Sequence, residues 1–209
     1  MFPAMQIDGD SITVTAAAAA ADIALPTLTN GDNPKWIMVN QEEVAVTHGI
    51  VRCGSSTVST ITTAVTGFVV PWGGYPLFIN CYGNSHIGYI RSGAADAELH
   101  ITPMSGNPPP EAFQQIGTGV AVTTGVAAEL AVPVFDTAIN AKYAVIQIEG
   151  AGDAAIRPGQ TGGTAVTAAT GLMVPHDGVP LVLQLAGNDV ISHLSIASTP
   201  ILHAIPIAW

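Results

Sequence analysis

Histidine side chains are the first candidates for chemistry in this sequence, because imidazole ligates metals and exchanges protons near neutral pH. The chain has six histidines among its 209 residues. None of them forms an H-x-H pair or an H-E-x-x-H sequence, which are spacings that bring two imidazoles to one metal ion. We therefore predict no metal site and no cofactor.

Ser85 stands directly before His86, which places a hydroxyl beside a base. A nucleophile elbow would need a strand-to-helix turn and a glycine two residues after the serine, and Ile87 occupies that position. Gly83 and Asn84 instead favour a hairpin turn. A metal enzyme of the cupin type would need clustered histidine and glutamate ligands, which neither half of the sequence presents. We predict no catalytic residue and no enzymatic activity.

The two cysteines, Cys53 and Cys81, are too few and too isolated in the sequence for a metal cluster or a disulfide framework. Cys81 alternates with Leu77 and Ile79, which places these three side chains on one inward face of a predicted strand. We expect both cysteines to be buried free thiols.

An internal repeat organises the chain. Residues 66–71 (TGFVVP) resemble residues 170–175 (TGLMVP), 104 positions later, and several glycines, prolines and apolar residues downstream keep this offset. Residues 35–39 (KWIMV) match residues 142–146 (KYAVI) at an offset of 107, and differences in loop length would produce such a change between elements. The pattern predicts two copies of one domain that arose by internal duplication.

The repeat also gives the expected domain boundaries. An N-terminal arm of residues 1–10 precedes a first domain of residues 11–104, and a second domain covers residues 118–209. Between them, residues 105–117 form a linker whose three consecutive prolines favour an extended and fairly stiff chain.

Each copy contains a series of short β runs, about eight in number, rich in Val, Ile and Thr and separated by Gly, Pro, Asn or Asp. Such strands bury one face most economically when two sheets pack face to face. We therefore predict an all-β fold of two tandem jelly-roll-like β-sandwich domains. The alanine-rich residues 16–21 favour helix by composition, but their partners 123–128 include Gly and Val, so we expect a loop or edge segment there.

Charged residues are scarce and mostly acidic. They make up 10% of the chain against roughly 25% in ordinary soluble domains, which suits a subunit largely covered by neighbours. The net charge of −10 repels phosphate backbones, so we predict no nucleic-acid partner. The sequence shows neither a signal peptide nor an apolar run near the ~18 residues of a membrane span. We expect synthesis in the cytoplasm and no membrane partner.

Charged residues recur at three equivalent positions of the two copies. Because the chain has so few charges, this repetition indicates a role in the architecture of each domain, such as pairing at strand ends, rather than ligand binding. The three pairs are Asp22 with Glu129, Lys35 with Lys142, and Arg52 with Arg157.

Aromatic residues at places where the copies differ are the candidates for contacts with other molecules. Trp72 and Tyr75 stand in a turn where the second copy has His176 and Val179. Exposed aromatic side chains are favoured interface anchors, although packing over the end of the sandwich would also explain them. Trp209, the last residue, lies outside the repeat and is the third candidate interface residue.

The pattern K-W-I-M-V-N … V-R-C-G … T-G-F-V-V-P-W-G-G-Y-P-L-F-I … A-E-L-H-I-T-P of the first copy resembles small β-sandwich proteins encoded among the head genes of tailed bacteriophages. These include capsid cement or decoration proteins, which sit on the outer shell, often as trimers, and clamp adjacent capsomers. The resemblance implies a structural virion protein on the capsid surface, with the major capsid protein as partner. It also implies a homo-oligomer, with a trimer favoured, and it brings no catalytic residues.

A carbohydrate-binding or receptor-binding module of a phage fibre, a tail or an adhesin is the alternative. Such a module would carry a polar and aromatic groove, and the sequence places it at the turn containing Trp72. The same fold serves attachment to capsids and to tails, so the sequence leaves both open.

Overall fold

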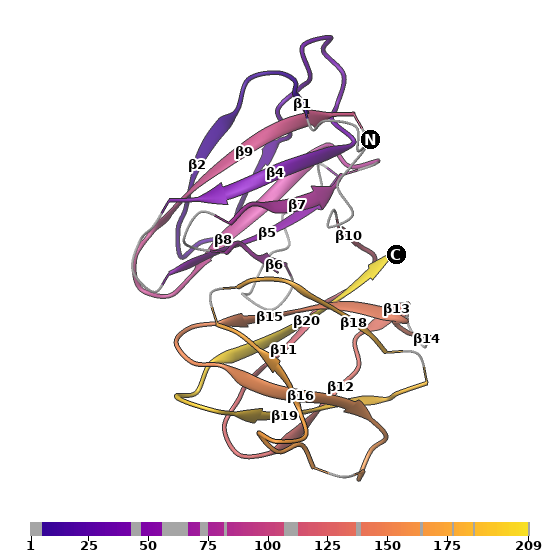
Figure 1. Cartoon of the computed structure of the whole chain (residues 1–209). Coiled ribbons are helices and arrows are strands. Elements are labelled where there is room, and N and C mark those ends of the chain that lie inside the picture. Colours follow the sequence, from indigo (N-terminus) through magenta and orange to yellow (C-terminus); the bar gives the residue numbers. More distant parts are fainter. Residues whose placement is uncertain are drawn as a thin grey trace. The chain divides into compact units, whose positions relative to one another are not determined.

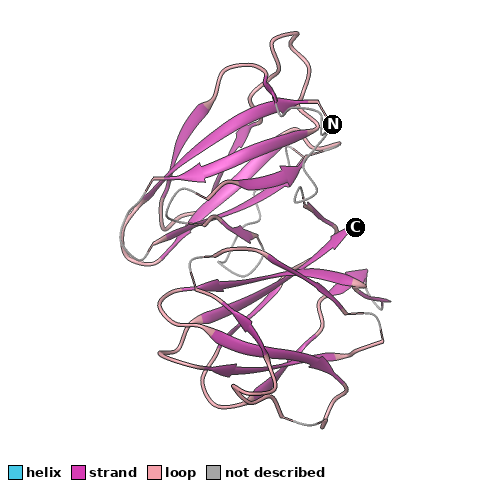
Figure 2. Cartoon of the chain, in the orientation of Figure 1, coloured by secondary structure: helices cyan, strands magenta, loops and turns pink. Residues whose placement is uncertain are grey.

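The computed structural model describes most of the chain, namely residues 6–42, 47–55, 67–71, 75–81, 83–106, 113–136, 139–163, 165–176, 178–185 and 187–208. These residues form strands and turns and no helix (Figure 2). They therefore include no helical segment long and apolar enough to cross a membrane. The prediction of an all-β fold is confirmed. Two compact units divide the chain, Met1–Gln114 and Gln115–Trp209, and the division falls inside the segment predicted as the linker, residues 105–117.

The first unit consists of two antiparallel sheets (Figure 1). One sheet has the order β2 (Ile12–Ala16), β9 (Ala97–Ser105), β4 (Trp36–Gln41), β7 (Leu77–Asn80), and the short β1 (Gln6–Ile7) also pairs with β9. The other sheet has the order β3 (Ala21–Ala24), β8 (His86–Ser92), β5 (His48–Gly54), β6 (Phe68–Val69).

The second unit also consists mainly of two antiparallel sheets. One has the order β11 (Val120–Thr123), β20 (Ile201–Ala208), β15 (Tyr143–Glu149), β18 (Leu181–Gln184), and β10 (Gln114–Gln115) also pairs with β20. The other has the order β12 (Ala128–Ala131), β19 (Val190–Ser195), β16 (Ala154–Gly159), β17 (Leu172–Val174). A separate hairpin joins β13 (Val134–Asp136) to β14 (Ile139–Asn140).

The order of the main strands is the same in the two units. The eight main strands are β2 to β9 in the first unit, and β11, β12 and β15 to β20 in the second. When each set is numbered from one to eight along the chain, both units have sheets of order 1-8-3-6 and 2-7-4-5. This is the strand order of an eight-stranded jelly roll. It could not be predicted from the sequence, because each sheet pairs strands that are distant in the chain. That a duplication produced the two units stays a prediction.

The core of the second unit lies between its two sheets. Its buried cluster includes Ala144, Ile146 and Ile148 from β15, and it continues through Ile156 of β16 and Ile191 of β19 on the opposite sheet. Residues two apart on a strand point to the same face, so each of these strands gives alternate apolar residues to the core. Burial of this apolar area is the main term that favours the fold.

Glycine allows the two sheets of the first unit to approach closely. A Cβ atom placed on Gly49 of β5 would lie 2.5 Å from Cδ2 of Leu99, which belongs to β9 in the opposite sheet. Leu99 is fully buried, so its side chain occupies the space that a larger residue at position 49 would need.

The repeated Thr-Gly sequence before β6 and β17 has a similar steric cause. A Cβ atom on Gly67 would lie 2.6 Å from the carbonyl oxygen of Val51. At the equivalent Gly171 it would lie 2.8 Å from Cβ of Ala155 and 3.2 Å from the backbone nitrogen of Ile156. Each glycine therefore lets the short strand that follows it pack against β5 or β16.

We expect Gly171→Ala to lower the free energy of unfolding by about 1 to 3 kcal/mol, the usual cost of overpacking. Gly159→Ala is the matched control, because a Cβ atom at Gly159 of β16 would meet nothing within 4 Å. The control should change the stability by no more than about 0.5 kcal/mol. Urea unfolding of the full chain measures both, and equal effects of the two substitutions would contradict this account of the repeated glycine.

Candidate functional site

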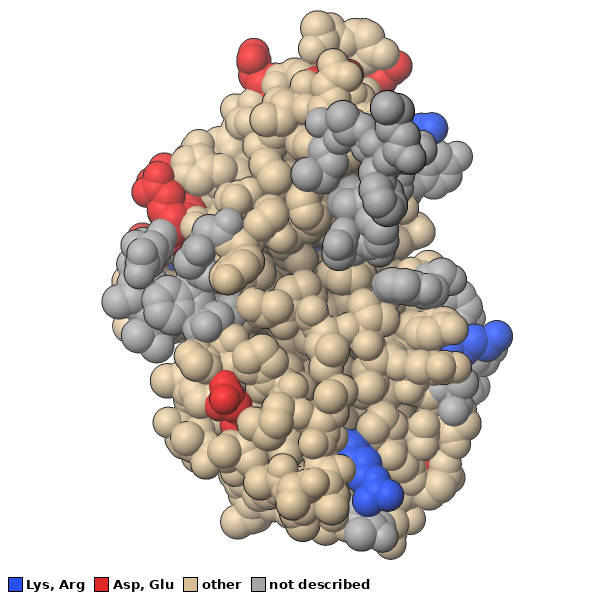
Figure 3. Space-filling view, viewed as in Figure 1, with Lys and Arg blue, Asp and Glu red and all other residues tan. Residues whose placement is uncertain are grey.

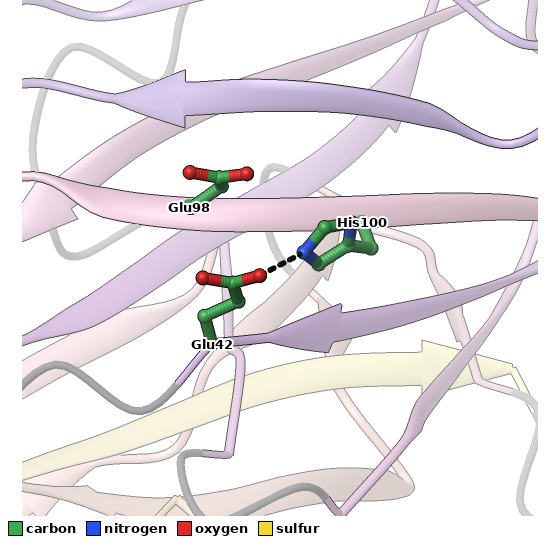
Figure 4. Close-up of side chains that lie close together, drawn as sticks. All are labelled: Glu42, Glu98 and His100. Atoms are coloured by element: carbon green, nitrogen blue, oxygen red, sulfur yellow. Dashed lines mark hydrogen bonds and ion pairs between the residues drawn. The ribbon is translucent and has the colours of Figure 1, made fainter.

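Three side chains that could ligate a metal converge at one end of the first unit (Figure 4). Glu98 and His100 are two residues apart on β9, so they point to the same face of the sheet. Glu42 directly follows β4, the neighbour of β9, and its backbone nitrogen donates to the carbonyl oxygen of Glu98 at 3.0 Å. The pairing of β4 with β9 therefore positions all three side chains.

The atoms that could ligate a metal, one from each of Glu42, Glu98 and His100, all lie within 4.8 Å of one another. Nε2 of His100 is 3.2 Å from Oε1 of Glu42, and Nδ1 of the same ring is 3.1 Å from Oγ1 of Thr13. A hydrogen bond to the second ring nitrogen fixes the orientation of an imidazole, as it does in metal sites. The group could hold a divalent cation with water in the remaining positions, but both glutamates are exposed to solvent.

This group was not predicted from the sequence. Ligands at short spacing can be recognised there, whereas Glu42 and His100 are 58 residues apart and meet through the strand pairing. The repeat contained a usable signal, because Glu42 and Glu149 are related by the same 107-residue offset as Lys35 and Lys142. The absence of a metal site stays a prediction.

The second unit has a counterpart of the glutamate–histidine pair but not of the full group. Oε2 of Glu149 is 2.8 Å from Nε2 of His203 on β20. Ile201 occupies the position of Glu98, because it precedes His203 by two residues on the equivalent strand. Ala121, the strand partner of His203, takes the place of Thr13, the partner of His100.

Burial separates the two pairs. The His203 side chain is 0% exposed and that of Glu149 is 9% exposed, whereas the corresponding values are 36% for His100 and 60% for Glu42. A buried carboxylate needs hydrogen-bond donors to offset its lost hydration, and the imidazole of His203 supplies one. We therefore expect the pair in the second unit to stabilise the fold.

The six repeated charges occupy equivalent places in the two units. Asp22 of β3 and Arg52 of β5 both lie opposite Gly88 of β8, so they share one row across the sheet. In the second unit Glu129 and Arg157 likewise both lie opposite Ser192. A small central residue separates the acid from the arginine in each row.

The lysines of the repeat are exposed, and each directly precedes a central strand of its sheet, β4 or β15. The backbone oxygen of Lys35 accepts a hydrogen bond from Cys81 at 2.7 Å, and that of Lys142 accepts one from Leu185 at 2.7 Å.

Of the two repeated arginines, Arg52 is more buried than Arg157, and this burial lowers the pKa of Arg52. A structural role for the six charges stays a prediction.

Of the three predicted interface residues, Tyr75 can be placed. It stands two positions before Leu77, the first residue of β7, and is 63% exposed. Trp72 and Trp209 lie outside the described residues. The interface role of all three stays a prediction.

Two exposed apolar side chains that could not be singled out from the sequence lie on neighbouring loops of the second unit. Val126 is 84% exposed and Ile196 is 41% exposed. Their loops are joined by a hydrogen bond from Ser195 N to Gly125 O at 3.1 Å. We call this region, with Val126, Ile196, Asp153 and His176, the tip of the second unit.

Two hydrogen bonds join Asp153 and His176 within the tip. Nδ1 of His176 is 2.8 Å from Oδ1 of Asp153, and the backbone nitrogen of His176 donates to the same oxygen at 2.9 Å. These hydrogen bonds lower the pKa of Asp153. The backbone nitrogen of Ile196 donates to the carbonyl oxygen of Asp153 at 3.0 Å, which connects the pair to the apolar residues.

His193 of β19 is buried, and its two ring nitrogens have no hydrogen-bond partner among the described residues. It lies opposite Ala128 and Ile156 in the sheet. Burial lowers the pKa of His193 from its ordinary value of 6.5, because the charged imidazolium would lose its hydration.

Double-mutant cycles should separate the two glutamate–histidine pairs. We expect a coupling of about 2 kcal/mol between Glu149 and His203, because a buried hydrogen bond to a charged group stabilises strongly. The exposed pair of Glu42 and His100 should show less than about 1 kcal/mol. Alanine substitutions, single and combined, followed by urea unfolding measure both. Equal couplings would contradict the assignment of a structural role to the buried pair.

The stability of the chain should depend on the protonation of His193. Its folded-state pKa is lowered, so the unfolded chain binds the proton first as the pH falls. The stabilising contribution is complete above pH 6.5 and is lost as the pH falls from 6.5 toward the lower folded-state pKa. Thermal unfolding of wild type and His193→Leu from pH 7.5 to about 5 tests this. The wild type should lose more stability than the variant, and parallel profiles would contradict the prediction.

Comparison of the chain with protein-family models, with curated proteins and with solved structures finds no match in any of the three.

Proposed function

We propose that this chain is a structural protein without enzymatic activity that binds the outside of a phage capsid and stabilises the contacts between capsomers. The observation that carries the proposal is the tip of the second unit, where Val126 and Ile196 are exposed on adjacent loops. Exposed apolar side chains that lie together on a surface are typical of sites that bind other proteins.

The low charge of the surface supports the same proposal. Charged residues occupy small, separate areas of the face shown in Figure 3, and other residues cover most of it. The centres of protein interfaces are depleted of charge, because each buried ion would lose its hydration. Such a surface suits a subunit that is covered by its neighbours.

The proposed partner is the major capsid protein, and the proposed assembly on the capsid surface is a homo-oligomer, with a trimer favoured. A trimer would present three copies of the tip to a shell that itself repeats. Several weak contacts made together then raise the overall affinity well above that of one contact. Synthesis in the host cytoplasm before assembly belongs to the same proposal.

The test is binding to capsids that lack the protein. We expect the purified wild type to saturate such particles in a sedimentation assay and to raise the temperature at which they break open. Val126→Asp should weaken binding at least about tenfold, because a charge would be buried in the contact. Ala168→Asp is the control. Ala168 is exposed on the loop between β16 and β17, so this substitution adds the same charge at a site away from the tip.

Wild-type protein that does not bind the particles would contradict the proposal. Equal losses for Val126→Asp and Ala168→Asp would leave the capsid role intact but would contradict the assignment of the tip. Light scattering of the free protein reports the oligomeric state separately.

The exposure of Tyr75 favours a second candidate, the carbohydrate-binding or receptor-binding module. An exposed tyrosine can stack on a sugar ring and also offers a hydroxyl for hydrogen bonding. Binding on a glycan array that Tyr75→Ala abolishes, together with no binding to capsids, would favour this candidate over the decoration protein.

A further inference from the structure

The two cysteines meet inside the first unit, although they are 28 residues apart in the chain. Cys53 lies on β5 in one sheet, and Cys81 directly follows β7 in the other. Their Sγ atoms are 2.7 Å apart, and both are free thiols in this structure. The cysteines look isolated in the sequence, because chain separation does not reveal a contact between opposite sheets.

Backbone hydrogen bonds hold both thiols in place. Cys53 pairs with Ile87 in the ladder between β5 and β8. Cys81 donates its backbone N–H to Lys35 at 2.7 Å, and its carbonyl oxygen accepts from Asn84 at 2.8 Å. The fold therefore brings the sulfur atoms together before any bond forms. A disulfide needs a separation near 2.05 Å, so a small side-chain movement is enough to close one.

We propose that Cys53 and Cys81 form a disulfide that joins the two sheets of the first unit when the folded protein meets a low-molecular-weight disulfide such as oxidised glutathione. The proposal is independent of the capsid role, because it rests on the placement of the two thiols alone.

Exposure gives the order of the steps. Cys53 is half-buried and Cys81 is buried, so the reagent reaches Cys53 first. The Cys53 thiolate attacks one sulfur of oxidised glutathione, the glutathione S–S bond breaks, and one glutathione thiolate leaves. The Cys81 thiolate then attacks Sγ of Cys53 and expels the second glutathione.

The reaction is balanced, because the two protein thiols are oxidised and one glutathione disulfide is reduced to two thiols, which take up the two protons released. Burial and the neighbouring Cys53 raise the pKa of Cys81. Because the thiolate is the attacking form, the second step should be slower than the first and should speed up with increasing pH.

The second unit provides an internal control. Pro158 of β16 occupies the position of Cys53, and Leu185 occupies that of Cys81. The backbone nitrogen of Leu185 donates to the carbonyl oxygen of Lys142, as that of Cys81 does to the carbonyl oxygen of Lys35. The chain has no further cysteine, so only the first unit can be joined in this way. The crosslink would close the segment that contains β6, β7 and Tyr75.

The experiment uses the full chain, folded and reduced, incubated with oxidised glutathione and then denatured without reductant for mass spectrometry. We expect the wild type to lose both titratable thiols and to become lighter by two hydrogen atoms, without a retained glutathione. Peptide mapping should find Cys53 joined to Cys81. Cys81→Ser should retain one glutathione on Cys53, and Cys53→Ser should react far more slowly.

A thermal unfolding scan of the oxidised protein adds a structural readout. Oxidation should raise the unfolding midpoint of the first unit, and dithiothreitol should reverse this rise. The midpoint of the second unit should not change in either step. Wild-type protein that keeps both thiols, or that accumulates a stable glutathione adduct at Cys53, would overturn the proposal. These wild-type outcomes decide the matter even if a serine variant fails to fold.

Discussion

Two sheets in each unit must approach closely enough to bury their inner faces, and this constraint determines where every other residue can go. In the first unit it requires Gly49 opposite Leu99, because a Cβ atom would stand 2.5 Å from the leucine. The glycines at 67 and 171 meet a separate constraint, because each lets the short strand that follows it, β6 or β17, approach its neighbouring strand within one sheet.

The two units carry different groups on the same strand order. The same strand positions present an exposed group of Glu42, Glu98 and His100 in the first unit and a buried pair of Glu149 and His203 in the second. The first unit alone brings two thiols together. The apolar tip that Val126 marks belongs to the second unit. A common strand order therefore supports different surfaces, which is how one fold serves more than one contact.

Much of the fold could be predicted from the sequence, because it depends on local signals. Alternating apolar residues and Gly or Pro breaks mark the strands, and the repeat predicts that equivalent residues occupy equivalent places. Residues 16–21 illustrate the use of the repeat. Their alanines favour a helix, yet β2 ends at Ala16, β3 begins at Ala21, and the residues between them form a loop.

The side-chain groups could be predicted less well, because they form between strands that are far apart in the sequence. Glu42 reaches His100 only through the pairing of β4 with β9, and Cys53 reaches Cys81 only across two sheets. Strand order decides both contacts, and sequence periodicity does not contain it. Short ligand spacings and aromatic residues in the sequence therefore predict neither the carboxylate–histidine group, nor the thiol pair, nor the tip.

Electron cryo-microscopy of capsids carrying the bound protein is the decisive measurement for the proposed capsid role. We expect density on the outer shell into which a two-sheet jelly roll of this strand order fits, with the loops of Val126 and Ile196 against the major capsid protein. Density confined to the tail, or a decorated shell in which these loops face solvent, would contradict it.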